Sequence, residues 1–166
     1  MMVAMRDQRF VATHRGGSLK RDDQLRLANW AANCAQRVLH LFSAISDDER
    51  PTQAIGIGLS WARGEIRTGV AMKASVAAHA AARTVKDRAA VASARAAGHA
   101  VATAHFADHC IGALLYALKA LEAAGLDSNA ELEWQLSQLP DDLRNLVSKN
   151  LEARMKLLKI QARIEP

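Results

Sequence analysis

The sequence predicts an all-α fold: one domain over residues 1–166, built as a bundle of five or six helices around a long central helix at about residues 88–124. Three observations support this prediction. Alanine dominates the 50% hydrophobic content and aromatic residues make up only 4%, which favours close helix packing over sheets. Apolar residues recur at helical intervals along most of the chain. The chain is also long enough to bury one core without disulfides or metals.

The first half of the chain is expected to form an irregular arm followed by three helices. The arm, residues 1–17, has no helical periodicity and ends in two glycines. Ser18 is the expected N-cap of the first helix, which carries Asp22 and Asp23 in its opening turns. Pro51 suits the first turn of the second helix. The three helices are expected over residues 20–43, 51–62 and 68–85.

The stretch after these helices is predicted to form the central helix. It contains no proline and is apolar on both sides of a helical wheel. A helix that is apolar nearly all round must be enclosed by other helices. We therefore expect one helix over about residues 88–124, with Asp87 as its N-cap. Because such a helix would be about 50 Å long, a kink is expected near Gly98 or Gly112.

Two more helices are expected at the end of the chain, over residues 129–138 and from Asp141 to near the C-terminus, with Pro140 between them. The last helix ends in a basic extension, residues 149–166. Since the net charge is +5 and the pI about 9.6, binding of nucleic acid has to be considered. The favoured interpretation of the extension is a solvated helix face, and a nucleic-acid-binding surface is the alternative.

Several classes of protein are excluded by what the sequence lacks. Cys34 and Cys110 are far apart and lie in apolar helical patterns, so we expect reduced core thiols. No segment resembles a signal peptide or a membrane span, which indicates a cytoplasmic protein without membrane contact. There is no GxSxG serine, no phosphate loop and no paired-carboxylate spacing. We therefore predict no catalytic residue, no cofactor and no enzyme.

Histidines are the main polar residues of the predicted central helix. His105 and His109 stand at i and i+4, which would place two imidazoles on one helix face. His79 or Glu65 could complete a ligand set, so a metal- or small-molecule-binding protein or enzyme that uses His79, His105 and His109 is one alternative. The favoured interpretation predicts no metal. It predicts hydrogen-bonded histidines in a packed seam, where another helix passes close to glycines.

Short fragments in a fixed order carry a resemblance to a known family over about residues 3–148. They are Phe10-Val, Leu19, Leu27-Ala-Asn-Trp30-Ala-Ala, Val38-Leu39, Leu41-Phe42, Trp61-Ala-Arg-Gly-Glu65, Ala77-Ala-His79-Ala-Ala-Ala-Arg83, Ala97-Gly98-His99-Ala-Val-Ala-Thr-Ala-His105, His109, Tyr116-Ala-Leu-Lys119-Ala, Glu133-Trp134-Gln135 and Leu139-Pro140. In this pattern the sequence resembles the small all-helical immunity proteins of bacterial polymorphic toxin systems.

The resemblance implies a protein that binds and neutralises a cognate toxin by protein–protein interaction and catalyses nothing. Nucleic acid is not expected as a partner, and a homo-oligomer is compatible with the sequence. The positive net charge indicates a toxin that is acidic or is not a nuclease. The predicted partner- or ligand-binding residues are the polar residues of the shared fragments: Glu65, His79, Arg83, His99, His105, His109 and Lys119.

Overall fold

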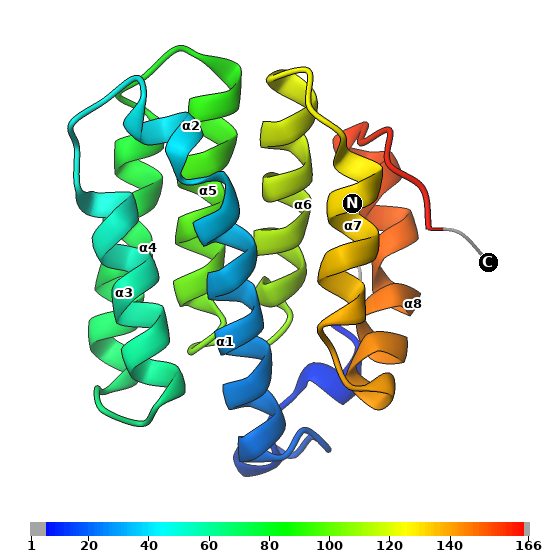
Figure 1. Ribbon diagram of the computed structural model, residues 1–166. Helices are drawn as coiled ribbons and strands as arrows, with labels where there is room; N and C mark the ends of the chain where they lie inside the picture. The colour runs from blue at the N-terminus through cyan, green and yellow to red at the C-terminus, as the bar shows by residue number, and fades with distance from the viewer. Residues whose placement is uncertain (1–5, 165–166) are drawn as a thin grey trace.

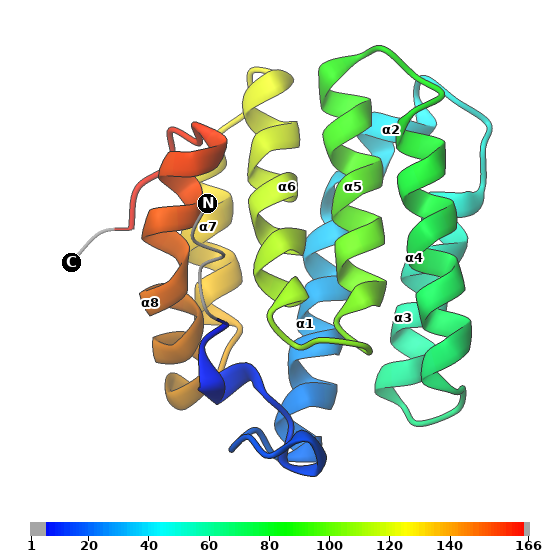
Figure 2. The ribbon, with the colours of Figure 1, turned by 180° about the vertical axis from the view of Figure 1, so that it is seen from behind.

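The computed structural model describes residues 6–164, which form a bundle of α-helices without a β-strand (Figures 1 and 2). The all-α prediction is confirmed. The described part contains seven helices of ten residues or more, because the predicted central helix is two helices. The predicted first helix is also broken, at Leu39. The helices are α1 (Arg21–Val38), α2 (His40–Ser43), α3 (Arg50–Ala62), α4 (Thr68–Ala82), α5 (Arg88–Ala102), α6 (His109–Ala123), α7 (Ser128–Ser137) and α8 (Asp141–Leu158).

The predicted single helix over residues 88–124 is wrong, and so is its predicted kink. The chain reverses over residues 103–108, so that α5 and α6 pack side by side as a helical hairpin (Figure 2). The turn contains neither Gly nor Pro, and its Ala104 and Ala107 are 5% and 2% exposed. These buried alanines continue the apolar pattern through the turn. The reversal lets the apolar sides of α5 and α6 pack against each other, which the two halves of one long helix could not do.

A side chain from α1 holds this turn in place. The amide Nε2 of Gln24 donates to the carbonyl oxygens of Thr103 and Ala104, at 3.1 and 3.3 Å. Gln24 is only 3% exposed. Because both acceptors are carbonyls at the C-terminal end of α5, the bonds satisfy groups that have no partner within the helix. The turn therefore depends on a contact from a residue about eighty positions earlier.

Replacing Gln24 with alanine is expected to lower the free energy of unfolding by about 1–2 kcal/mol, because two buried carbonyls lose their donor. Urea denaturation measures this difference. Gln36→Ala is the matched control, since Gln36 lies exposed on the same helix. Equal stability of the two variants would contradict the role assigned to Gln24.

The helix ends agree with the sequence at some positions and not at others. Asp87 caps α5 by accepting from the Ala90 N–H at 2.8 Å, and Pro51 stands in the first turn of α3, both as predicted. Ser18 is not an N-cap, because α1 begins at Arg21 without a side-chain cap. The residues before it pair with the arm instead: the Leu19 N–H donates to the Val11 carbonyl at 3.0 Å.

The basic C-terminal stretch is helical only in part. The helix α8 ends at Leu158, where Lys159 has a left-handed φ of 56°. The backbone then contacts the C-terminal end of α6, since the N–H groups of Gln161 and Ala162 donate to Glu122 Oε1 at 2.8 and 3.0 Å. The predicted helical extension is therefore shorter than expected. Binding of nucleic acid there stays the untested alternative to a solvated helix face. The ends of the chain, residues 1–5 and 165–166, lie outside the described part.

Both cysteines lie in the core, as predicted. Cys34 and Cys110 are fully buried and free, and burial raises the pKa of each thiol. The core around them is rich in alanine, which permits close approach of α1, α5 and α6. No helix in residues 6–164 is long and apolar enough to cross a membrane.

Candidate functional site

Three of the predicted site residues meet between α4, α5 and α6. His79 comes from α4, His99 from α5, and His109 is the first residue of α6. The Nδ1 atoms of His99 and His109 are 3.3 Å apart. The His79 ring stands edge-on to the His99 ring, with 5.1 Å between their centroids. These three residues, which we call the histidine cluster, are half-buried and join three helices.

Two glycines make room for the histidine cluster. A Cβ at Gly112 would lie 2.5 Å from His99 Nδ1, and a Cβ at Gly98 would lie 2.7 Å from His79 Nε2. Both distances are shorter than van der Waals contact allows. The ring of His99 is also stacked on that of Tyr116, with 5.1 Å between centroids and 15° between planes. The imidazoles therefore fill space that any other residue at positions 98 and 112 would occupy.

The electrostatics of the cluster favour neutral imidazoles. Burial, and then the charges of His79 and His109, lower the pKa of His99 to about 3 from an ordinary value of 6.5. Burial is also the main cause that lowers the pKa of His79 and of His109. With both rings neutral, one Nδ1–H donates to the lone pair of the other Nδ1. The cluster is thus suited to fixing the register of three helices.

His105 lies apart from the other three histidines, in the turn between α5 and α6. The predicted i, i+4 pair with His109 on one helix face is therefore wrong, because residues 103–108 are not helical. His105 packs on the ring of Phe106, with 4.1 Å between centroids. Among the described residues no group of three or more His, Cys, Asp and Glu side chains could hold a metal ion, so the ligand set considered from the sequence does not form there.

The remaining predicted residues lie near helix ends or on a helix surface. Glu65 follows α3 and is exposed, and its carboxylate accepts from Arg63 at 2.7 and 2.8 Å. Arg83 is the exposed C-cap of α4. Lys119 of α6 is half-buried beside a shallow pocket that Tyr116 also lines. Glu65 and Arg83 are open to a partner from solvent.

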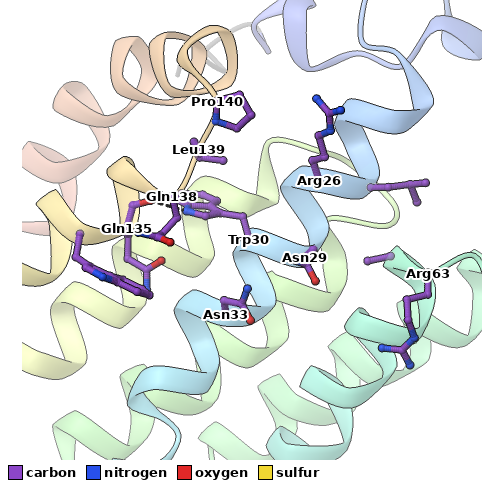
Figure 3. A pocket seen from close by; sticks show the side chains of 12 residues that line it. Arg26, Asn29, Trp30, Asn33, Arg63, Gln135, Gln138, Leu139 and Pro140 are labelled. Carbon is purple, nitrogen blue, oxygen red and sulfur yellow. Dashed lines mark hydrogen bonds between the residues drawn. The ribbon is translucent and has the colours of Figure 1, made fainter.

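Sequence reasoning missed a surface groove between α1, the end of α3 and α7 (Figure 3). Its volume is about 560 Å³. Trp134 of α7 lies at its edge with 43% of its surface exposed, and the Arg37 guanidinium lies 4.1 Å from the centre of the Trp134 ring. The residues that line the groove are Leu25, Arg26, Asn29, Trp30, Asn33, Ala62, Arg63, Trp134, Gln135, Gln138, Leu139 and Pro140.

Hydrogen bonds fix the walls of this α1–α7 groove. The indole N–H of Trp30 donates to the Gln135 carbonyl at 2.8 Å, which ties α1 to α7. Glu131, 8% exposed, accepts from Arg37 and from Gln135, each at 2.6 Å. The groove is therefore formed before any partner arrives.

The groove residues come from distant parts of the sequence. Helical periodicity could not predict that they line one groove, because in a helical pattern Trp134 is one more apolar residue. A signal did exist in the fragments that carry the family resemblance. Four of these fragments supply groove residues, namely those containing Trp30, Arg63, Trp134 and Pro140. Asn29, Arg63 and Trp134 are exposed there, so packing alone does not explain them.

Comparison with known families agrees with the resemblance. A family model described as Imm-5 like putative immunity protein matches residues 17–142, which includes α1 to α7, the histidine cluster and the groove. No curated protein and no solved structure matches the chain.

Proposed function

Because the chain belongs to the Imm-5 like putative immunity protein family, we propose that it binds and neutralises a cognate bacterial toxin by protein–protein contact. Family membership over residues 17–142 is the observation that carries this proposal. The protein acts by occupying the toxin and performs no catalytic step. Its partner is a protein toxin in the cytoplasm of the cell that makes both.

The α1–α7 groove is the surface that best fits such a partner. Trp and Arg are the residue types that most often carry the binding energy of an interface, and Trp134 with Arg37 stands exposed at the edge of the groove. The fixed walls reduce the ordering that binding would cost. We assign the groove to a protruding loop of the toxin, since its volume of about 560 Å³ suits a few side chains.

The residues predicted from the sequence then divide into two groups. His79, His99 and His109 act inside the bundle, where they fix helix register. Glu65 acts through Arg63, which it holds by two hydrogen bonds beside the groove. Arg83 and Lys119 lie outside the groove, so their role in toxin binding stays a prediction from the resemblance.

Co-expression tests the function. The gene for this chain is expressed together with the toxin domain encoded beside it, and growth of the host is compared with growth under the toxin domain alone. If the chain neutralises the toxin, growth is restored and the two proteins purify as a stoichiometric complex. Growth arrest despite folded, abundant protein would overturn it.

Trp134→Ala is expected to weaken toxin affinity by about 30-fold or more, because truncating a Trp that is a hot spot of an interface costs about 2 kcal/mol or more of binding. Calorimetry with the purified toxin domain measures this change. The melting temperature should change little, since Trp134 is 43% exposed. Val76→Ala on α4 is the control, because Val76 is 69% exposed and does not line the groove. Unchanged affinity in the Trp134 variant would exclude the groove as the contact surface.

A further inference from the structure

A second, smaller cavity lies where the N-terminal arm crosses the bundle. Its volume is about 180 Å³. Three arginines and two histidines are among the thirteen described residues that line it, and none of these thirteen is Asp or Glu. The charged and polar residues around it are Arg6, His14 and Arg15 from the arm, Arg21 and Gln24 from α1, Thr68 from α4, and His105 from the turn before α6. We call this cavity the arm pocket.

Aromatic rings, more than carboxylates, hold the arginines of the arm pocket. The guanidinium carbons of Arg6 and Arg15 lie 3.8 and 4.5 Å from the centre of the Phe106 ring. That of Arg21 lies 4.3 Å from the centre of the Trp61 ring. A guanidinium packed on a ring keeps the N–H donors in its own plane free to bind an anion.

The positive charge of the arm pocket is only partly compensated. Arg6 pairs with Asp108 at 3.1 Å. Within residues 6–164, the side chains of Arg15 and Arg21 form no ion pair and no hydrogen bond to another residue. Burial, followed by the charges of Arg15 and Arg6, lowers the pKa of His105, which agrees with a positive field.

Two further groups at the arm pocket favour an anion. The hydroxyl of Thr68 accepts a hydrogen bond from the Trp61 indole at 3.1 Å, so its own hydrogen is available to donate. Arg21 is the first residue of α1, and the N-terminal end of a helix is partly positive. Asp22 and Asp23 follow in the same turn, but they do not line the pocket, and Asp23 pairs with Arg26 at 3.7 Å.

We infer that the arm pocket binds a phosphate group, as free phosphate or as a small phosphate monoester. Two guanidiniums without a carboxylate partner among residues 6–164 match a group that carries close to two negative charges, whereas one carboxylate would neutralise only one. The volume of about 180 Å³ holds one phosphate with part of its ester and no polymer. Because Arg15 belongs to the arm and Arg21 to α1, the bound anion would tie the arm to the bundle.

This site is independent of toxin binding, and it needs arm residues that precede the family match at residue 17. Calorimetric titration with inorganic phosphate, AMP and acetate at constant ionic strength tests it. We expect binding of phosphate or AMP, or both, and much weaker binding of acetate. Tighter binding of AMP would identify the monoester as the ligand, and tighter binding of phosphate the free ion. No phosphate or AMP binding at millimolar concentration would overturn the proposal.

Two matched double variants distinguish phosphate binding in the arm pocket from general attraction of phosphate to a positively charged protein. Arg15→Gln with Arg21→Gln is expected to weaken phosphate binding at least about 10-fold, since each substitution removes charge-assisted donors. Lys73→Gln with Arg88→Gln removes the same charge at exposed positions that do not line the pocket. Equal weakening in both double variants would overturn the site. Both glutamine variants change exposed residues, so circular dichroism should show unchanged folding.

Discussion

Replacing Gly112 with alanine is expected to destabilise the protein by about 2 kcal/mol, although alanine is the better helix former. The new Cβ would lie 2.5 Å from Nδ1 and 2.7 Å from Cγ of His99. His99 is stacked on Tyr116 and packed against His79, so its ring has little room to move away. Overpacking of this kind typically costs 1–3 kcal/mol. For a chain of this length the melting temperature should fall by about 4–8 °C.

Gly56→Ala is the matched control for this prediction. Gly56 lies in the interior of α3 and is exposed, and nothing lies within 4 Å of a Cβ built on it. Alanine there should stabilise the protein by about 0.5–1 kcal/mol through helix propensity alone. Gly98→Ala should behave like the Gly112 variant, because its Cβ would meet His79. Thermal melts in which all three variants are stabilised would contradict the packing argument.

Acidification from pH 7 to pH 5 is expected to remove about 2 kcal/mol of stability through His99 alone. The pKa of His99 is about 3 in the folded protein and near 6.5 in the unfolded chain. Between these values the unfolded chain binds more protons, so the free energy of unfolding falls as the pH falls. The stability that depends on a neutral His99 is therefore fully present above pH 6.5, the pKa in the unfolded chain, and is lost as the pH falls toward 3. His79 and His109 act in the same direction, because their pKa values are also lowered.

The charges around the histidine cluster also support a loss of stability at low pH, because most of them oppose protonation of the imidazoles. Arg95, Arg83, Arg154 and Arg6 oppose a proton on one or more of the three rings, and only Asp108 favours one, on His109. Urea titrations at pH 7, 6 and 5 measure the effect. His99→Gln should flatten the dependence, while His40→Gln, at an exposed position on α2, should leave it unchanged. A free energy of unfolding that stays constant from pH 7 to pH 5 would contradict the prediction, because protonation of the histidine cluster would then not destabilise the fold.

The contrast between Gln24 and Trp134 illustrates the limits of prediction from sequence. The helix that contains Trp134 was predicted within one residue of its bounds, and the start of the helix that contains Gln24 was predicted equally well, but neither residue was predicted as a site residue. Helical periodicity reports which side of a helix is apolar. It cannot report that Gln24 reaches a turn eighty residues later, or that Trp134 stays exposed beside α1. Such facts depend on how helices are placed relative to one another.

The sequence by itself determined the helical class, the family, the capping of α5 by Asp87 and the burial of both cysteines, because these follow from composition, local hydrogen bonding and motif order. It also indicated His79, His99 and His109 as candidate site residues. Only the tertiary structure decided that residues 88–124 fold back on themselves. The reason is energetic: the buried alanines of the turn keep the apolar pattern unbroken, and reversal is favoured by the contact of α5 with α6 and by the bonds from Gln24. That reversal brings His99 to His109 and separates His105 from both.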